Sequence, residues 1–213
     1  MRPLLVLFDV DGTLFLTHDP LAGVALRETL AARYGVTLPG DAIERVDHEG
    51  QTSLRIARLV LRQAGLDDLR IDGGLHDWCR AFAASYLRLL EAADTSGWRA
   101  VAEADHALEQ LAAAGHRLAL LTGNPEPMAR TRLERLGLAR FFPPGQGAFG
   151  CDAESREELI ELARARAGEW PATRTVEVGD TERDASSAHA AGIRSILVDD
   201  SGLDDVVSQL LDV

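Results

Sequence analysis

The chain has 213 residues, a length that fits one domain with an insertion or two small domains and that allows a sizeable buried core. Hydrophobic residues make up 46% and charged residues 26%, which is the composition of a soluble folded protein rather than a disordered one. Aspartate and glutamate outnumber the basic residues by 34 to 22, and the formal charge of −12 disfavours nucleic acids and anionic membranes as general partners.

The residue types that the chain lacks narrow the chemistry further. All 22 basic residues are arginines, so the absence of lysine excludes Schiff-base chemistry and any phosphate-binding loop that needs Gly-Lys.

The two cysteines, Cys79 and Cys151, match no metal or redox spacing, which predicts reduced thiols and a cytoplasmic location. The apolar run at residues 3–8 is too short for a signal sequence, so we expect no export by that route. No apolar run reaches membrane-spanning length, so we expect no membrane anchor.

Apolar runs typical of buried parallel strands alternate with helical patterns along the chain. The predicted strands cover residues 3–8, 117–122, 175–178 and 194–198. The predicted helices around the later strands cover residues 102–114, 128–136, 155–167 and 182–191. This alternation predicts an α/β fold, a doubly wound parallel sheet with helices on both faces.

The segment between the first predicted strand and the helix near residue 101 is too long for a simple connection. Its roughly ninety residues carry helical periodicity at 21–34, 53–64 and 75–90, whereas a crossover between parallel strands needs only about a dozen. We therefore predict that residues 16–95 form an inserted helical cap. Residues 1–15 and 96–213 then form the α/β core.

The first predicted strand leads directly into two carboxylates and a turn, at Asp9, Asp11 and Gly12. Ligands of open parallel sheets bind at the carboxyl ends of the strands. Asp9 and Asp11 can converge on one small volume if the extended geometry continues, and the pair then needs either one protonated carboxyl or a cation. One aspartate could attack phosphorus while the other exchanges protons, with Mg²⁺ offsetting the charge. An acidic turn or an incomplete calcium loop is the alternative.

The second predicted strand also ends in polar residues. Thr122, with the backbone N–H groups of Gly123 and Asn124, would bind phosphoryl oxygens at the start of a helix. We expect Asn124 to cap that helix and Pro125 to be its first residue. A helix cap with no further role is the alternative.

A third group of candidates follows the strand predicted at residues 175–178. Asp180 would join Asp9 and supply a metal ligand, and Asp184, one helical turn later, could support it. An acidic helix start is the alternative. These carboxylates and a phosphate need a positive group, and Arg156, at the start of a predicted helix, is our candidate, although a surface position is commoner for any single arginine.

Together these segments resemble the haloacid dehalogenase-like superfamily, specifically its phosphatases of the phosphoglycolate phosphatase type with a helical cap inserted after the first motif. The resemblance covers essentially the whole chain. It implies that Asp9 is the nucleophile and a Mg²⁺ ligand, and that Asp11 is the acid/base whose backbone carbonyl also binds the metal. It also implies a phosphate-binding hydroxyl at Thr122, a second acidic Mg²⁺ ligand at Asp180 and a supporting acid at Asp184.

The chain departs from the family pattern in its third motif, which usually contains a lysine. Arg156 can fill this place because arginine also stays charged and binds both carboxylate and phosphate. Members that dehalogenate have a tyrosine where this chain has Asp11, which argues against dehalogenation. Members that cleave carbon–phosphorus bonds depend on a cap lysine, which this chain lacks.

One stretch of the predicted cap is similar to the family's substrate-specificity loop. By that resemblance Gln51, Thr52 and Arg55 could face the leaving group when the cap closes and excludes water. A plain helix N-terminus with solvated charges is the alternative. We interpret His18 and His48 as solvated polar residues.

We therefore predict a Mg²⁺-dependent phosphatase that hydrolyses a small phosphorylated metabolite through an aspartyl-phosphate intermediate. A sugar phosphomutase would use the same residues and stays an alternative. A non-catalytic phosphate-binding module would not need both Asp9 and Asp11, and a phospho-accepting receiver domain is countered by the cap insertion and the missing lysine. The motifs do not distinguish phosphoglycolate, a nucleotide and a sugar phosphate as substrate, and they predict no oligomeric state.

Overall fold

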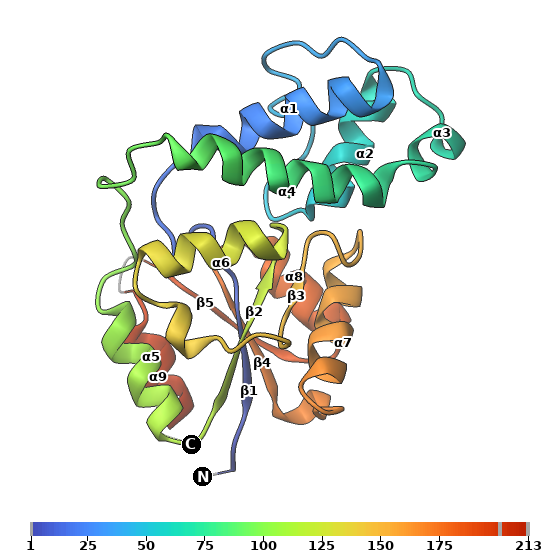
Figure 1. Ribbon diagram of the computed structural model, residues 1–213. Helices are drawn as coiled ribbons and strands as arrows, with labels where there is room; N and C mark the ends of the chain where they lie inside the picture. Colours follow the sequence, from blue (N-terminus) through green and yellow to red (C-terminus); the bar gives the residue numbers. More distant parts are fainter. Residues whose placement is uncertain (1, 200–201, 212–213) are drawn as a thin grey trace.

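A five-stranded parallel sheet forms the centre of the computed structural model, which describes residues 2–199 and 202–211 (Figure 1). The strand order is β3-β2-β1-β4-β5. The strands are β1 (Leu5–Phe8), β2 (Arg117–Thr122), β3 (Ala148–Phe149), β4 (Thr175–Gly179) and β5 (Arg194–Leu197). The predicted α/β fold is confirmed.

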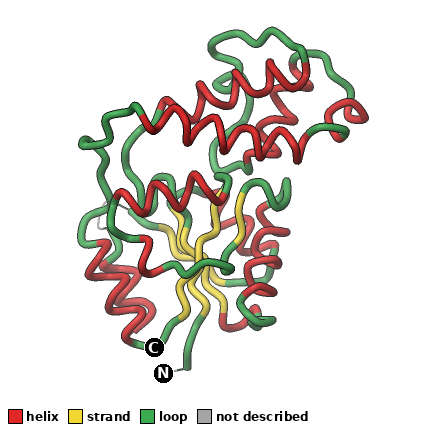
Figure 2. Tube along the Cα trace, in the orientation of Figure 1, coloured by secondary structure: helices red, strands yellow, loops and turns green. Residues whose placement is uncertain are grey.

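Side chains of β1 alternate between the two faces of the sheet, and each face has its own core. Val6 and Phe8 pack on one face with buried residues of α5 (Ala104–Ala113), α6 (Glu126–Arg135) and α9 (Asp204–Leu211). Leu5 and Leu7 pack on the other face with α7 (Arg156–Arg166) and α8 (Glu182–Ala190). Figure 2 shows the strands enclosed between these two layers of helices. Burial on both faces explains why β1 is continuously apolar.

Four helices after β1 gather at one end of the molecule, above the carboxyl ends of the strands (Figure 1). They are α1 (Pro20–Tyr34), α2 (Ser53–Gln63), α3 (Asp68–Asp72) and α4 (Leu75–Glu91). Their apolar faces form a separate core in which Trp78 is fully buried, stacks on Phe82 and donates a hydrogen bond to Thr29 Oγ1 (2.9 Å). Met128 of α6 also belongs to this core, so the helical group is packed onto the sheet domain.

The structure contains three elements that the sequence analysis does not predict. The strand β3 has two residues and the helix α3 has five, and both are too short for a periodic pattern to develop. The helix α9 follows β5, and its buried residues Val206 and Leu210 belong to the first core. Two short 3₁₀ turns complete the described fold, at Ala139–Phe141 and Ala172–Arg174.

The prediction of two reduced thiols is wrong, because Cys79 and Cys151 form a disulfide. Cys79 is a buried residue of α4, and Cys151 lies in the loop after β3, so the bond joins the helical group to the sheet domain. Their Cα atoms are 5.8 Å apart although the residues are 72 positions apart in sequence. Only the folded arrangement brings them together, and no spacing rule shows it. The disulfide also removes the basis on which a cytoplasmic location was predicted.

Within residues 2–199 and 202–211, no helix combines the length and the apolar composition that crossing a membrane requires.

Candidate active site

The carboxyl ends of β1, β2 and β4 meet at one edge of the sheet, where the predicted site residues lie. Phe8, the last residue of β1, is in register with Leu120 of β2 and Val178 of β4. The strands β2 and β4 continue for two residues and one residue beyond these positions, so all three end close to the same level. Gly12 has φ +79°, which turns the chain after β1, and a Cβ built on it would lie 2.1 Å from Asp180 Oδ2. A side chain at residue 12 would therefore displace Asp180.

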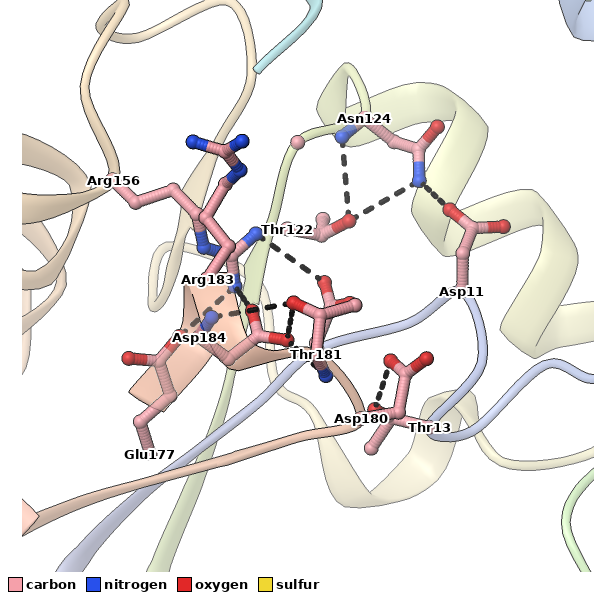
Figure 3. Close-up of polar contacts among 12 residues, drawn as sticks. Asp11, Thr13, Thr122, Asn124, Arg156, Glu177, Asp180, Thr181, Arg183 and Asp184 are labelled. Carbon is pink, nitrogen blue, oxygen red and sulfur yellow. Dashed lines mark hydrogen bonds and ion pairs between the residues drawn. The ribbon is translucent and has the colours of Figure 1, made fainter. Parts of the chain in front are cut away.

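Asp9, Asp180 and Asp184 form a compact acidic cluster at this edge. One carboxylate oxygen from each lies within 4.8 Å of the others. Asp9 is 6% exposed and Asp184 is fully buried. The hydroxyl of Thr13 donates to Asp180 Oδ1 at 3.1 Å, and the hydroxyl and N–H of Thr181 donate to Asp184 Oδ2 at 2.6 and 2.9 Å (Figure 3). These hydrogen bonds fix the orientation of the second and third carboxylates.

Arg156 is the positive group buried beside this cluster. It is the first residue of α7, where Ser155 caps the helix, and it is only 4% exposed. Its guanidinium donates to Glu177 Oε1 at 2.9 Å, forms a close ion pair with Asp184, and lies 3.8 Å from Asp9 Oδ1. Burial alone would lower the pKa of Arg156, but the carboxylates around it raise the pKa, so it stays charged.

The carboxylates outnumber the positive charge, and their pKa values reflect this. Burial raises the pKa of Asp9 well above its usual range; Arg156 opposes the rise, and Asp184 and Asp11 add to it. Burial also raises the pKa of Asp180, and it raises the pKa of Glu177 to about 7 against the opposing effect of Arg156. A cation would relieve this excess of negative charge. The donor set of three carboxylates fits a hard divalent ion such as Mg²⁺.

Asp11 lies at the same edge, but its carboxylate belongs to a different group of contacts. Arg132 Nη1 donates to Asp11 Oδ1 at 2.8 Å, and the amide of Asn124 makes a close hydrogen bond to Asp11 Oδ2. In Figure 3 the Asp11 side chain points toward Asn124. With 52% of its side chain exposed, Asp11 is accessible from the cavity above the sheet edge.

Arg132 connects Asp11 to the helical group. The residue is 2% exposed, and its Nη2 and Nε atoms lie 3.0 Å from Asp19 Oδ2 and 3.2 Å from the Tyr86 hydroxyl. Asp19 caps the N-terminus of α1, and Tyr86 lies on α4. The guanidinium also lies over the rings of Phe15 and Tyr86, at 5.0 and 5.4 Å from their centroids. We call Arg132, Asp11, Asp19 and Tyr86 the Arg132 cluster.

The loop after β2 carries the next three predicted residues. Thr122 is buried, and its hydroxyl accepts hydrogen bonds from the backbone and side-chain nitrogens of Asn124 at 3.3 and 3.1 Å. The prediction that Asn124 caps α6 is wrong, because the capping residue is Pro125 and the Asn124 amide is engaged by Thr122 and Asp11. Thr122, Gly123 and Asn124 all line the cavity.

Of the three predicted cap residues, the structure places only Gln51 in the wall of this cavity. Thr52 is fully buried, caps α2 through Arg55 N, and donates to the carbonyl of Glu154 at 2.9 Å. Arg55 lies in a neighbouring surface depression, which shares Gln51 and Arg156 with the cavity. Thr52 therefore joins the helical group to the sheet domain.

Two charged residues of this region were not predicted from the sequence, although the position of each in its element gives a signal. Arg132 lies on the buried face of α6 with Met128, Ala129 and Leu133. Glu177 occupies the middle of the fully buried strand β4. A charged residue within an apolar periodicity requires a buried partner of opposite charge, and these two residues have Asp19 and Arg156 respectively.

A cavity of about 580 Å³ lies between the sheet edge and the helical group. Asp9, Asp11, Thr122 and Arg156 line it from the sheet side, and residues of α1, α2 and α4 line it from the other. The arrangement can bind a phosphoryl group beside a buried carboxylate and enclose the rest of a small molecule.

Comparisons with known proteins agree over most of the chain. A model of the haloacid dehalogenase-like hydrolases matches residues 4–192. A phosphoglycolate phosphatase from Mesorhizobium japonicum is 31% identical over 201 residues, which make up 93% of this chain and 83% of the relative. A predicted phosphatase from Clostridium acetobutylicum aligns over 100% of both chains with a TM-score of 0.66 at 17% identity. CbbY from Rhodobacter sphaeroides, solved with phosphate, aligns over 92% of this chain and 86% of its own with a TM-score of 0.61 at 21% identity.

Proposed function

The chain belongs to the haloacid dehalogenase-like hydrolases, and on that premise we propose that it hydrolyses a small phosphate monoester through a phosphoryl group carried on Asp9. The observation that supports the proposal is the acidic cluster of Asp9, Asp180 and Asp184 beside a cavity that Asp11 and Thr122 also line. In this proposal residues 16–95 are a cap that encloses the leaving group.

In the first step a carboxylate oxygen of Asp9 attacks phosphorus, and the bond from phosphorus to the leaving oxygen breaks. The electron pair stays on the leaving oxygen, which takes a proton from the Asp11 carboxyl group. The Thr122 hydroxyl and the backbone N–H groups of Gly123 and Asn124 bind the phosphoryl oxygens. The product alcohol then leaves, and the phosphoryl group remains on Asp9.

In the second step Asp11, now ionised, takes a proton from a water molecule that attacks phosphorus. The acyl-phosphate bond to Asp9 breaks, which restores the Asp9 carboxylate and releases inorganic phosphate. Arg156 offsets part of the negative charge on Asp9 and holds Asp184 in place. Gln51 contacts the leaving group from the cap side.

A divalent cation fits the carboxylates of Asp9, Asp180 and Asp184, and the backbone carbonyl of Asp11 is its further proposed ligand. When bound, Mg²⁺ supplies positive charge that neutralises the attacking carboxylate and the phosphoryl oxygens.

Phosphate release from a panel of small monoesters, with Mg²⁺ and with a chelator, tests this function. We expect Mg²⁺-dependent release by the natural chain and a loss of about 10⁴-fold or more in kcat for Asp9→Asn. The nearly isosteric change keeps the fold, which circular dichroism checks. Asp94→Asn, at an exposed carboxylate outside the site, is the matched control and should keep full activity. Near-full activity of Asp9→Asn would reject the nucleophile.

The same panel distinguishes the alternatives. A sugar phosphomutase would convert a hexose 1-phosphate to its isomer with little release of free phosphate. A non-catalytic module would bind a monoester and release no phosphate from any of them.

A further inference from the structure

The cavity between the cap and the sheet edge has a cationic residue that the proposed chemistry does not use. Two arginines line this cavity, Arg156 and Arg27. Arg156 is held by Glu177, Asp184 and Asp9. Arg27 has no hydrogen bond or ion pair with any residue in the ranges 2–199 and 202–211. The charge of Arg27 is therefore free to pair with a group that enters the cavity.

The position of Arg27 is on the cap side, away from the carboxylates that bind Arg156. Arg27 lies on α1, one turn after Gly23, and a Cβ built on Gly23 would lie 3.4 Å from Arg27 Nη1. Both residues line the cavity, so the guanidinium lies along the wall that Gly23 leaves open. A substrate bound with its phosphoryl group at Asp9 would extend its leaving group toward this wall.

The surroundings of the cavity are acidic, so the positive charge of Arg27 matters for the binding of an anion. The chain has a formal charge of −12, and Glu44 and Glu49 are exposed residues that also line the cavity. An anionic leaving group would be repelled unless a positive group receives it. Apolar residues Leu26, Ile43 and Phe82 form part of the same wall and reduce the water around such a pair, which strengthens it.

We propose that Arg27 is a specificity-determining residue that binds a negatively charged group, a carboxylate or a second phosphate, on the alcohol part of the substrate. This inference rests on the proposed phosphatase function and names the class of its substrate. Arginine suits both groups because its guanidinium forms two parallel hydrogen bonds to either one. His18 and His48 also line the cavity, but histidine is not permanently charged. Among the described residues, Arg27 is therefore the one permanent cation of the cavity without a partner.

Matched substrates test the role of Arg27. The series consists of carboxyalkyl phosphates of increasing chain length, starting with 2-phosphoglycolate, and their hydroxyalkyl and bisphosphate counterparts. For Arg27→Gln we expect kcat/KM to fall about 10- to 100-fold on at least one anionic member and to stay unchanged on its neutral hydroxyalkyl counterpart. The loss shows which anion Arg27 binds, because the carboxylate and bisphosphate arms are measured separately.

Two further variants separate recognition from folding. Arg27→Lys keeps the charge and should recover part of the lost kcat/KM. Arg33→Gln removes another arginine of α1, which pairs with Asp77 and does not line this cavity, and it should leave the ratio of anionic to neutral substrates unchanged. An equal loss of kcat/KM on anionic and neutral substrates in Arg27→Gln, or no loss on any, would overturn the inference. Failure of the natural chain on every monoester would instead reject the phosphatase function.

Discussion

Arg156 and Arg132 are both buried and both held by carboxylates, but the charge around them is balanced differently. Arg156 faces Glu177 and Asp184, both fully buried, with Asp9 at 3.8 Å. Arg132 faces one buried carboxylate, Asp19, while half of the Asp11 side chain is exposed.

Aromatic groups complete the surroundings of the second arginine. The Tyr86 hydroxyl donates to Asp19 at 2.5 Å, and the rings of Phe15 and Tyr86 cover the guanidinium of Arg132. The Arg132 cluster is thus nearly neutral once water screens Asp11. The surroundings of Arg156 keep an excess of negative charge. This difference supports the proposed cation site beside Arg156, whereas Arg132 joins the helical group to the sheet domain.

Replacing each arginine by leucine should give the largest measurable difference between the two sites. Arg156→Leu leaves Glu177 and Asp184 buried without a positive partner and should cost about 3–5 kcal/mol of unfolding free energy. Arg132→Leu leaves only one buried carboxylate, Asp19, without a positive partner and should lower the unfolding free energy by about 2 kcal/mol. Urea denaturation measures both.

A control variant and a double variant complete this test. Arg45→Leu breaks an ion pair with Asp41 in which both side chains are about half exposed, and it should change stability little. Adding Glu177→Leu to Arg156→Leu removes one of the stranded carboxylates and should recover part of the loss. Equal costs for the two single variants would contradict the difference in charge balance.

The disulfide is a covalent connection between the helical group and the sheet domain, independent of the Arg132 cluster. Because Cys79 and Cys151 are 72 residues apart, the bond should stabilise the fold by about 4 kcal/mol through the unfolded chain. The double variant Cys79→Ser/Cys151→Ser should unfold at correspondingly lower urea concentration. In that variant fewer contacts hold the helical group on the sheet domain. Arg132→Leu should therefore lower the unfolding free energy by more than it does in the natural chain.

A reducing agent supplies the control for this prediction. It should lower the stability of the natural chain to that of the double variant and leave the double variant unchanged. Detection of two free thiols in the unfolded, non-reduced chain would contradict the disulfide.

A divalent ion should act on the acidic cluster beside Arg156 and not on the ion pair of Arg132 with Asp19. At about a hundred times its dissociation constant, Mg²⁺ should raise the stability of the natural chain by about 2.7 kcal/mol relative to the chelated protein. Thermal denaturation measures this gain, which Asp180→Asn should reduce because it removes one carboxylate charge from the acidic cluster. Asp19→Asn, in the Arg132 cluster, should leave the gain unchanged. A melting temperature that does not respond to Mg²⁺ would contradict the cation site.

The sheet domain was predictable from sequence because short segments with apolar residues in strand patterns mark β1, β2, β4 and β5. Thr122 is the last residue of β2, and Asp9 and Asp180 directly follow β1 and β4. The positions of the acids followed from the rule that strands of a parallel sheet end at the same edge.

The connections between cap and core were not predictable in the same way. The disulfide and the contact of Arg132 with Asp19 join residues separated by 72 and 113 positions, and only packing of the helical group determines these pairs. Arg27 lacks any local pattern, since an unpaired arginine on a helix looks like a solvated residue until the cavity beside it is known. Arg132 and Glu177 did carry a local signal, a charge on a buried face, but their partners lie on other elements.

Chemical trapping of the phosphorylated protein tests the nucleophilic role of Asp9 most directly. The protein is mixed with a monoester labelled in its phosphoryl group, quenched in acid and digested, and the labelled peptide is sequenced by mass spectrometry. Our account predicts one hydroxylamine-sensitive acyl phosphate on Asp9, present in the natural chain and absent in Asp9→Asn. Steady turnover with the label on another residue, or with no covalent label at any time during the reaction, would contradict it.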